Sequence, residues 1–134
     1  VPTSILMLDL DNLKKINDSK GHHVGDEAIR AVANILRSTL RKTDCACRLG
    51  GDEFVVILPN TGHEQAIQFA KRIHDRSRKE LSQFSVDSAV VTASMGVTTI
   101  VPEDCSYKDT IKRADLALYE AKNSGRNKVC YYYH

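Results

Sequence analysis

Short apolar runs alternate with segments of helical periodicity along almost the whole chain, and this alternation limits the possible folds more than any other feature. In the first run, residues 4–10, apolar residues occupy consecutive positions, which is typical of a strand buried on both faces. Two further runs, 46–49 and 54–58, flank a pair of glycines and predict a β-hairpin. Strands are also expected at 89–97 and 129–133, the last at an edge of the sheet.

Four segments have the apolar spacing of helices. Residues 12–18 predict one or two helical turns, and a glycine-marked turn over 19–25 follows. Residues 26–40 predict a helix that Asp26 caps, and further helices are expected at 64–81 and 109–123, the last closed by Gly125. The order βααββαβαβ predicts an α/β fold with a mixed central sheet flanked by helices. Residues 1–134 are expected to form one domain.

Charge and composition exclude several classes of protein. The formal net charge is +2, and no basic stripe indicates a nucleic-acid partner. No apolar run reaches the ~18–20 residues of a membrane span, so we expect no membrane contact from this domain. Four cysteines are present, and their spacing does not match a zinc site, which favours reduced thiols in a cytoplasmic protein: Cys45, Cys47, Cys105 and Cys130.

Carboxylates stand where two of the predicted strands end. Asp9 and Asp11 follow the first apolar run, and Asp52 and Glu53 lie at the tip of the predicted hairpin. If the strand lies beside the hairpin, Asp9 and Asp52 come within reach of one hard cation, and oxygen ligands with open positions favour magnesium. Two such ions would neutralise charge in phosphoryl transfer. A helix-capping turn at the first cluster and a solvated hairpin tip at the second fit the sequence equally well.

The residues around both acidic clusters resemble one family. Residues 48–54, RLGGDEF, are similar to the signature of GGDEF-domain diguanylate cyclases, and residues 9–18, DLDNLKKIND, resemble the family's metal-and-guanine segment. Gly21-His22 and Gly25-Asp26 continue that segment. SMGV at 94–97, ADLALYEAK at 114–122 and GRN at 125–127 resemble a later strand, the last helix and the turn after it. The similarity covers nearly the whole chain and implies a fold that resembles the palm of nucleotide cyclases and polymerases.

The resemblance also implies roles for individual residues. Two magnesium ions, or manganese in their place, would be held by Asp9, the Leu10 carbonyl, Asp52 and Glu53. Asp52 would in addition accept the proton of the GTP 3′-hydroxyl. Guanine would be bound by Asn17 and Asp26, with His22 in the nucleotide pocket. The phosphates would be bound by Lys14, Lys122 and Arg126. Taken singly, these residues fit plain structural roles as well: a turn residue, a surface histidine, a helix N-cap and cations at a helix end.

A second motif precedes the hairpin. Arg41 and Asp44 stand three residues apart, and the resemblance implies that they form an inhibitory site for the product cyclic di-GMP, to which Arg72 could contribute. The alternative is an ordinary surface ion pair at the i,i+3 spacing of a helix.

The activity that the resemblance implies is the condensation of two GTP molecules into cyclic di-GMP, with release of two pyrophosphates. One domain presents one GTP, so two domains must face each other as a homodimer. A catalytically silent domain that binds GTP or cyclic di-GMP is the alternative. A cyclase for another nucleotide is disfavoured by Asp26, because adenine lacks the N1 and N2 donors of guanine. Leu13 replaces the family's phenylalanine, and the usual Leu-Thr-Gly-Leu-x-Asn-Arg segment is missing before the first strand, so we expect a domain excised from a longer protein.

Overall fold

The computed structural model describes residues 2–86 and 89–132, and its elements follow the predicted order. The strands are β1 (Thr3–Asp11), β2 (Cys45–Gly50), β3 (Glu53–Pro59), β4 (Thr92–Thr99) and β5 (Val129–Tyr132). The helices are α1 (Leu13–Lys20), α2 (His22–Thr39), α3 (His63–Leu81) and α4 (Tyr107–Asn123), and a short 3-10 helix η1 (Ser82–Phe84) follows α3. The predicted α/β fold with a mixed sheet and flanking helices is confirmed.

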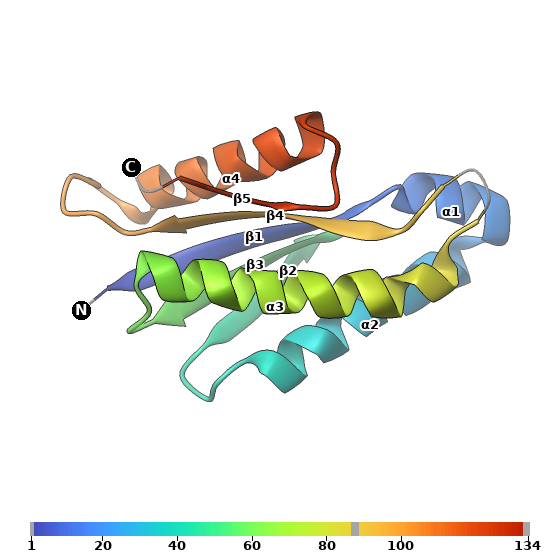
Figure 1. Ribbon diagram of the computed structural model, residues 1–134, viewed down its shortest axis with the longest axis horizontal. Helices are drawn as coiled ribbons and strands as arrows, with labels where there is room; N and C mark the ends of the chain where they lie inside the picture. Colours follow the sequence, from blue (N-terminus) through green and yellow to red (C-terminus); the bar gives the residue numbers. More distant parts are fainter. Residues whose placement is uncertain (1, 87–88, 133–134) are drawn as a thin grey trace.

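The five strands form one sheet in the order β2-β3-β1-β4-β5. β1 lies at its centre and pairs antiparallel with both β3 and β4, whereas β5 runs parallel to β4. β5 is therefore an edge strand, as predicted. Figure 1 shows the sheet as a layer with α4 on one face and α2 and α3 on the other.

Both faces of β1 are buried, which explains its consecutive apolar residues. Leu6 and Leu8 belong to the larger core cluster, which is shared with α2 and α3. Ile5 and Met7 point the other way and pack with Ala114 and other residues of α4. Alternate residues of a strand face opposite sides of the sheet, so a strand covered on both sides must be apolar throughout.

Helix α4 lies unusually close to the sheet because β4 has a glycine beneath it. A Cβ atom at Gly96 would overlap the Ala114 carbonyl oxygen and the Leu118 amide nitrogen, both in the backbone of α4. Glycine removes that obstacle and lets the helix backbone rest on the strand. This contact fixes the height of α4 above the sheet, and with it the place of the residues at the C-terminal end of the helix.

Two predicted boundaries differ from the structure by three residues or more, and a third lies outside the described residues. α2 begins at His22, so Asp26 is its fifth residue and not its N-cap; Gly21, at φ 94°, ends α1 and allows the next helix to start at once. β4 begins at Thr92, because Ala89 instead forms an isolated bridge with Val86. The end of the last predicted strand, Tyr133, lies outside the described residues.

The cysteines and the helices bear on two further predictions. All four cysteines lie within the described residues and none takes part in a disulfide. No helix in residues 2–86 and 89–132 combines the length and the apolar character that crossing a membrane requires.

Candidate active site

The two acidic clusters meet at one end of the sheet, the end at which β1 stops and the β2–β3 hairpin turns (Figure 1). Asp9 is the direct antiparallel partner of Glu53, and the Leu10 amide donates a hydrogen bond to the Asp52 carbonyl at 3.2 Å. Gly50 and Gly51 have φ angles of 136° and 51°, which a tight hairpin tip of this kind requires. The first strand therefore lies beside the hairpin, which is the condition on which the predicted cation site depends.

Negative charge is concentrated between β1 and the hairpin tip. Burial is the largest influence on the Asp9 carboxyl and raises its pKa to about 7; the nearby Lys122 ammonium acts against this shift and the Asp52 carboxyl adds to it. Burial, together with Asp115 and Asp52, also raises the pKa of Glu53. Asp9 Oδ1 is buried and receives no hydrogen bond from any described donor. An ionised carboxylate in such a position is costly unless a cation compensates it.

The oxygen atoms at this point suit a hard divalent cation. Asp9 and Asp52 supply adjacent carboxylates, and the Leu10 carbonyl lies beside them, where it accepts a hydrogen bond from Lys122 Nζ at 3.3 Å. Oxygen donors of this kind are the ligands that magnesium and related ions prefer. Within the described residues, no group of three or more His, Cys, Asp or Glu side chains is gathered as a metal cluster. The structure brings together Asp9 and Asp52, two of the three carboxylates that were expected to bind metal. The third, Glu53, is the strand partner of Asp9.

Asp11 is a site residue that sequence reasoning left without a role. Its side chain is fully buried, on the same side of β1 as Asp9, and it accepts hydrogen bonds from Thr92 Oγ1 at 2.7 Å and from Ser94 Oγ at 2.8 Å. Lys122 Nζ donates to it at 2.7 Å. The sequence pattern that could have identified Asp11 as a site residue is its i,i+2 spacing from Asp9, which places both carboxylates on one face of the strand.

The expected guanine-binding residues come from α1 and α2. The Asn17 side chain fits against the second of these helices only because position 25 is glycine, where a Cβ atom would overlap Asn17 Oδ1. Asn17 Oδ1 is buried and has no hydrogen-bond partner among the described residues. His22 and Asp26 are exposed four residues apart on the first turns of α2, and so lie on the same side of that helix.

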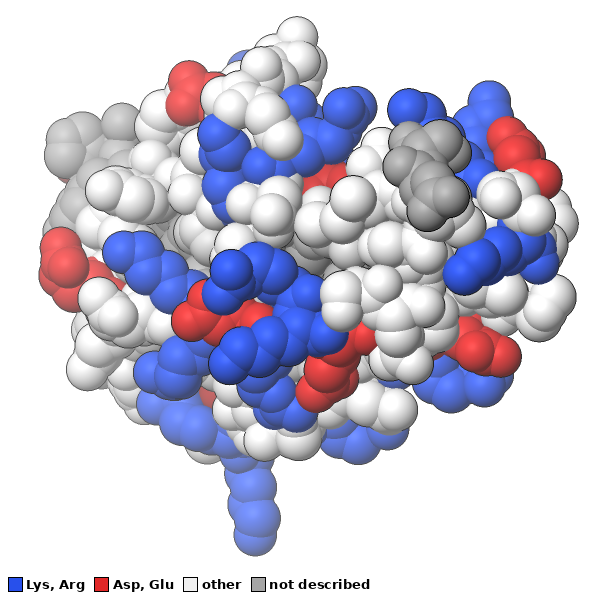
Figure 2. Space-filling model, turned by 45° about the vertical axis from the view of Figure 1, so that its right-hand side comes forward, with Lys and Arg blue, Asp and Glu red and all other residues white. Residues whose placement is uncertain are grey.

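The expected phosphate-binding residues lie around the same end of the sheet. Lys14 is exposed on α1, and Lys122 in the last turn of α4 reaches Asp9 Oδ2 at 3.5 Å. Arg126 is exposed in the turn after α4, where it has a positive φ of 63°. Figure 2 turns this end of the molecule toward the viewer and shows basic side chains directly beside acidic ones.

The Arg41–Asp44 motif lies at the other end of the sheet. The two residues occupy the turn between α2 and β2, so the helical geometry assumed from their spacing is wrong. Arg41 Nη2 donates to Asp44 Oδ1 at 2.9 Å and to the Pro59 carbonyl at 2.8 Å. Burial alone would raise the pKa of the Asp44 carboxyl, but the hydrogen bonds from Arg41 outweigh it and lower the pKa below its usual value.

A groove of about 500 Å³ opens beside this ion pair. Arg41 and Asp44 line it together with Arg72, which lies on α3 with its guanidinium 5.5 Å from the centre of the Phe69 ring. The Arg41 side chain is half exposed, whereas that of Asp44 is fully covered. An ion pair and a neighbouring groove with a second arginine are thus both present, and the inhibitory site stays a prediction.

Comparison with known proteins gives consistent results. Residues 1–128 match the family described as "Diguanylate cyclase, GGDEF domain". Response regulator PleD of Caulobacter vibrioides is 44% identical over 132 residues, which are 96% of this chain and 29% of PleD. The active GGEEF domain of a diguanylate cyclase from Vibrio cholerae superposes with a TM-score of 0.86 at 34% identity, over 99% of this chain and 84% of that one. The GGDEF domain of DgcB from Caulobacter crescentus, in complex with c-di-GMP, gives a TM-score of 0.84 at 31% identity, over 97% and 77% of the two chains.

Proposed function

The chain belongs to the GGDEF domain family of diguanylate cyclases, and from that membership we propose that it condenses two molecules of GTP into cyclic di-GMP and releases two pyrophosphates. One observation carries the proposal: the hairpin tip lies against the end of β1, so that Asp52 and Asp9 adjoin, with Lys122 Nζ 3.5 Å from Asp9 Oδ2. The chain spans 29% of the length of PleD, so the activity of a whole protein is part of the proposal.

Membership in this family implies a divalent metal ion, and we propose that the ion is magnesium, two per active site. Asp9, Asp52 and the Leu10 carbonyl would hold it, with Glu53 in support. When bound, magnesium would neutralise charge on the phosphates of GTP. The unpartnered Asp9 Oδ1 and the raised pKa of that carboxyl support a cation at this point, because a cation would compensate both.

The remaining residues bind and orient GTP. Lys122, Lys14 and Arg126 would bind phosphate oxygens, the arginine through its planar fork. Asn17 and Asp26 would accept hydrogen bonds from guanine, and His22 would lie in the nucleotide pocket. Asp52, at the hairpin tip, would accept the proton of the 3′-hydroxyl as that oxygen attacks an α-phosphate.

A homodimer completes the reaction in this proposal. Each chain would present one GTP, and the 3′-hydroxyl of each would attack the α-phosphate of the other across a two-fold axis. Cyclic di-GMP would also bind in the groove at Arg41 and Asp44, with Arg72 contributing from α3, and would inhibit the enzyme there.

The test is to measure cyclic di-GMP formed from GTP and Mg²⁺ by the complete natural protein and by its Asp52→Asn variant. We expect synthesis by the wild type and a loss of about 10²-fold or more in the variant, because an amide is neither a base nor a good magnesium ligand. Asp75→Asn, a carboxylate exchanged on the surface of α3, is the control that should retain activity. A wild type that binds GTP without turnover would instead identify the silent signalling domain, and inhibition of turnover by ATP would refute the guanine selectivity.

A further inference from the structure

Asp11 is a buried carboxylate for which the proposed reaction has no use, although it lies two residues from Asp9. Its donors come from three separate segments of the chain. Thr92 Oγ1 and Ser94 Oγ lie on β4, Lys122 Nζ lies on α4, and the Asn127 amide, at 3.1 Å, lies in the turn after α4. The two oxygens of a carboxylate, with about four lone pairs, can accept from all of these groups at once.

One consequence concerns the Lys122 ammonium. It donates to Asp11 Oδ1 at 2.7 Å, which is shorter than its distances to Asp9 Oδ2, 3.5 Å, and to the Leu10 carbonyl, 3.3 Å. Asp11 therefore provides the shortest of its contacts and keeps a flexible lysine side chain directed at the acidic end of the sheet. Without that carboxylate, four rotatable bonds would allow the ammonium to move into solvent.

The other consequence concerns the turn that carries Arg126. Arg126 and Asn127 have φ angles of 63° and 51°, a left-handed conformation that is uncommon for an arginine and more readily adopted by an asparagine. The Asn127 amide donates to both Asp11 Oδ2 and Ser94 Oγ, and its side chain bonds His74 Nε2 of α3 at 2.8 Å. Asp11 is thus one of the groups that hold this turn, and with it the backbone of Arg126, in place.

We propose that Asp11 is a positioning residue for phosphate binding: its buried carboxylate holds Lys122 and the 124–127 turn where Lys122 and Arg126 can bind the phosphates of GTP. This inference rests on the proposed function, because it concerns the same GTP site. Ser94 assists, since it donates to Asp11 and accepts from the Asn127 amide. Asp11 itself touches neither the nucleotide nor the reacting atoms.

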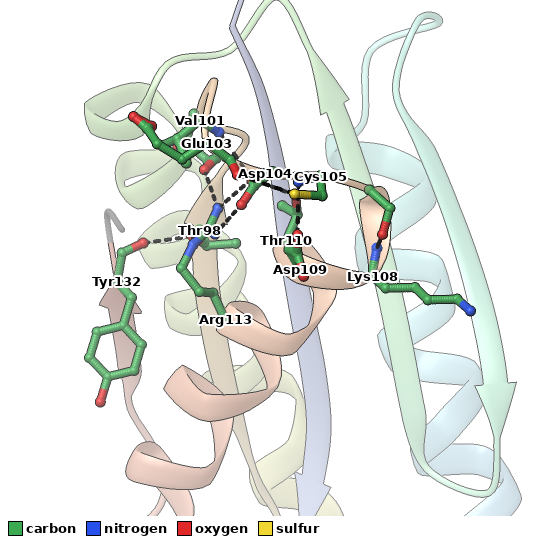
Figure 3. A network of polar contacts seen from close by, with 12 residues as sticks. Thr98, Val101, Glu103, Asp104, Cys105, Lys108, Asp109, Thr110, Arg113 and Tyr132 are labelled. Carbon is green, nitrogen blue, oxygen red and sulfur yellow. Dashed lines mark hydrogen bonds and ion pairs between the residues drawn. The ribbon is translucent and has the colours of Figure 1, made fainter.

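A purely structural anchor is the competing explanation, and the opposite end of α4 offers a matched control. There the carboxylate of Asp104 binds Arg113 Nη2 at 2.9 Å, Thr110 Oγ1 at 2.8 Å and the Val101 amide at 3.1 Å (Figure 3). Its side chain is only 7% exposed. Asp104→Asn therefore removes a covered, multiply bonded carboxylate from the loop that precedes the same helix, at the end away from Lys122 and the turn.

The experiment compares wild type, Asp11→Asn and Asp104→Asn in the complete natural protein. The probes are 3′-deoxy-GTP with Mg²⁺, which lacks the attacking hydroxyl and cannot react, and 3′-deoxyguanosine, which lacks the phosphates. We expect Asp11→Asn to raise the Kd of 3′-deoxy-GTP roughly ten- to a hundredfold, the range for hydrogen bonds to charged groups. The Kd of 3′-deoxyguanosine should stay within about twofold, because the base contacts come from α1 and α2. Asp104→Asn should lower the urea midpoint and change neither Kd.

Each other result has a definite meaning. An equal loss of affinity for both probes, or the same selective loss in Asp104→Asn, would make Asp11 a structural anchor only and overturn the inference. A wild type that binds 3′-deoxyguanosine but gains nothing from the phosphates would refute phosphate binding in the proposed function, and the inference with it. If Asp11→Asn does not fold, Ser94→Ala decides: a severalfold loss selective for 3′-deoxy-GTP supports the inference, and unchanged affinity overturns it.

Discussion

The acidic end of the sheet should destabilise the metal-free protein, and Asp9→Asn should relieve this. Burial raises the pKa of Asp9 from 3.8 to about 7, so the folded state holds a proton on this carboxyl that the unfolded state releases. The free energy of unfolding is therefore unaffected by Asp9 below about pH 4, falls as pH rises from about 4 to about 7, and stays lowered above that. Asparagine carries no charge at any pH, so the variant should lose this component of the pH dependence.

The size of the effect follows from the shift. Each pKa unit is worth about 1.36 kcal/mol, so a shift of about three units corresponds to roughly 4 kcal/mol at pH 8. This value is an upper bound. The carboxyl is 24% exposed, so water reduces the penalty. We expect Asp9→Asn to stabilise the metal-free protein by about 1–3 kcal/mol at pH 8 and by less than about 0.5 kcal/mol at pH 4.

Urea denaturation with EDTA, at pH values from 4 to 8, measures this difference. Magnesium should raise the stability of the wild type at pH 8 and that of Asp9→Asn much less, because a ligand that binds only the folded state stabilises it. Asp18→Asn, an exposed carboxylate on α1, is the control for the removal of one negative charge. If wild type and Asp9→Asn change in parallel across this pH range, Asp9 is not an uncompensated buried charge and the argument for a cation at this point fails.

Three further changes test the fold, the guanine contact and the product site. Gly96→Ala should destabilise by about 1–3 kcal/mol, because its Cβ would overlap the backbone of α4, whereas at Gly62, the N-cap of α3, a Cβ would meet no atom nearer than 4.0 Å and Gly62→Ala should cost only about 0.5 kcal/mol in the same urea titration. Asp26→Ala should raise the KM for GTP by an amount equivalent to about 1–3 kcal/mol, with Glu27→Ala as control; an unchanged KM would leave Asp26 without a role in guanine binding. Arg41→Ala should relieve inhibition by added cyclic di-GMP, and equal inhibition of variant and wild type would reduce the motif to an ion pair.

Local sequence patterns were sufficient for most of the fold. The consecutive apolar residues of β1 indicated burial on both faces, and α2, α3 and α4 on the two sides of the sheet confirm it. The start of α2 was missed because Asp26 is a good N-cap residue by type. Helix entry was decided instead by Gly21, whose positive φ ends one helix and permits the next to begin immediately.

The site was predictable only where its parts are joined by short connections. The glycine pair predicted a hairpin, whereas the register of β1 with β3, which brings the hairpin tip to Asp9, joins segments more than 40 residues apart. The Asp11 network depends instead on the β1–β4 register, which pairs Asp11 with Thr92, and on the height of α4, which Gly96 sets. These are contacts between segments more than 80 residues apart for β4 and more than 110 for α4, and no local pattern reports them.

The positions of the two proposed sites limit how inhibition by the product can work. Asp52 precedes the first residue of β3, and Arg41 bonds the carbonyl of its last residue, Pro59, so the length of a seven-residue strand, roughly 20 Å, separates them. Cyclic di-GMP in the groove at Arg41 therefore would not occupy the GTP site of the same chain. Inhibition should then be non-competitive with GTP and should act on the approach of two chains, because each reaction requires a second active site facing the first. The central strand β1 is paired on both edges and covered on both faces. Binding at one end of the sheet therefore need not distort the site at the other end.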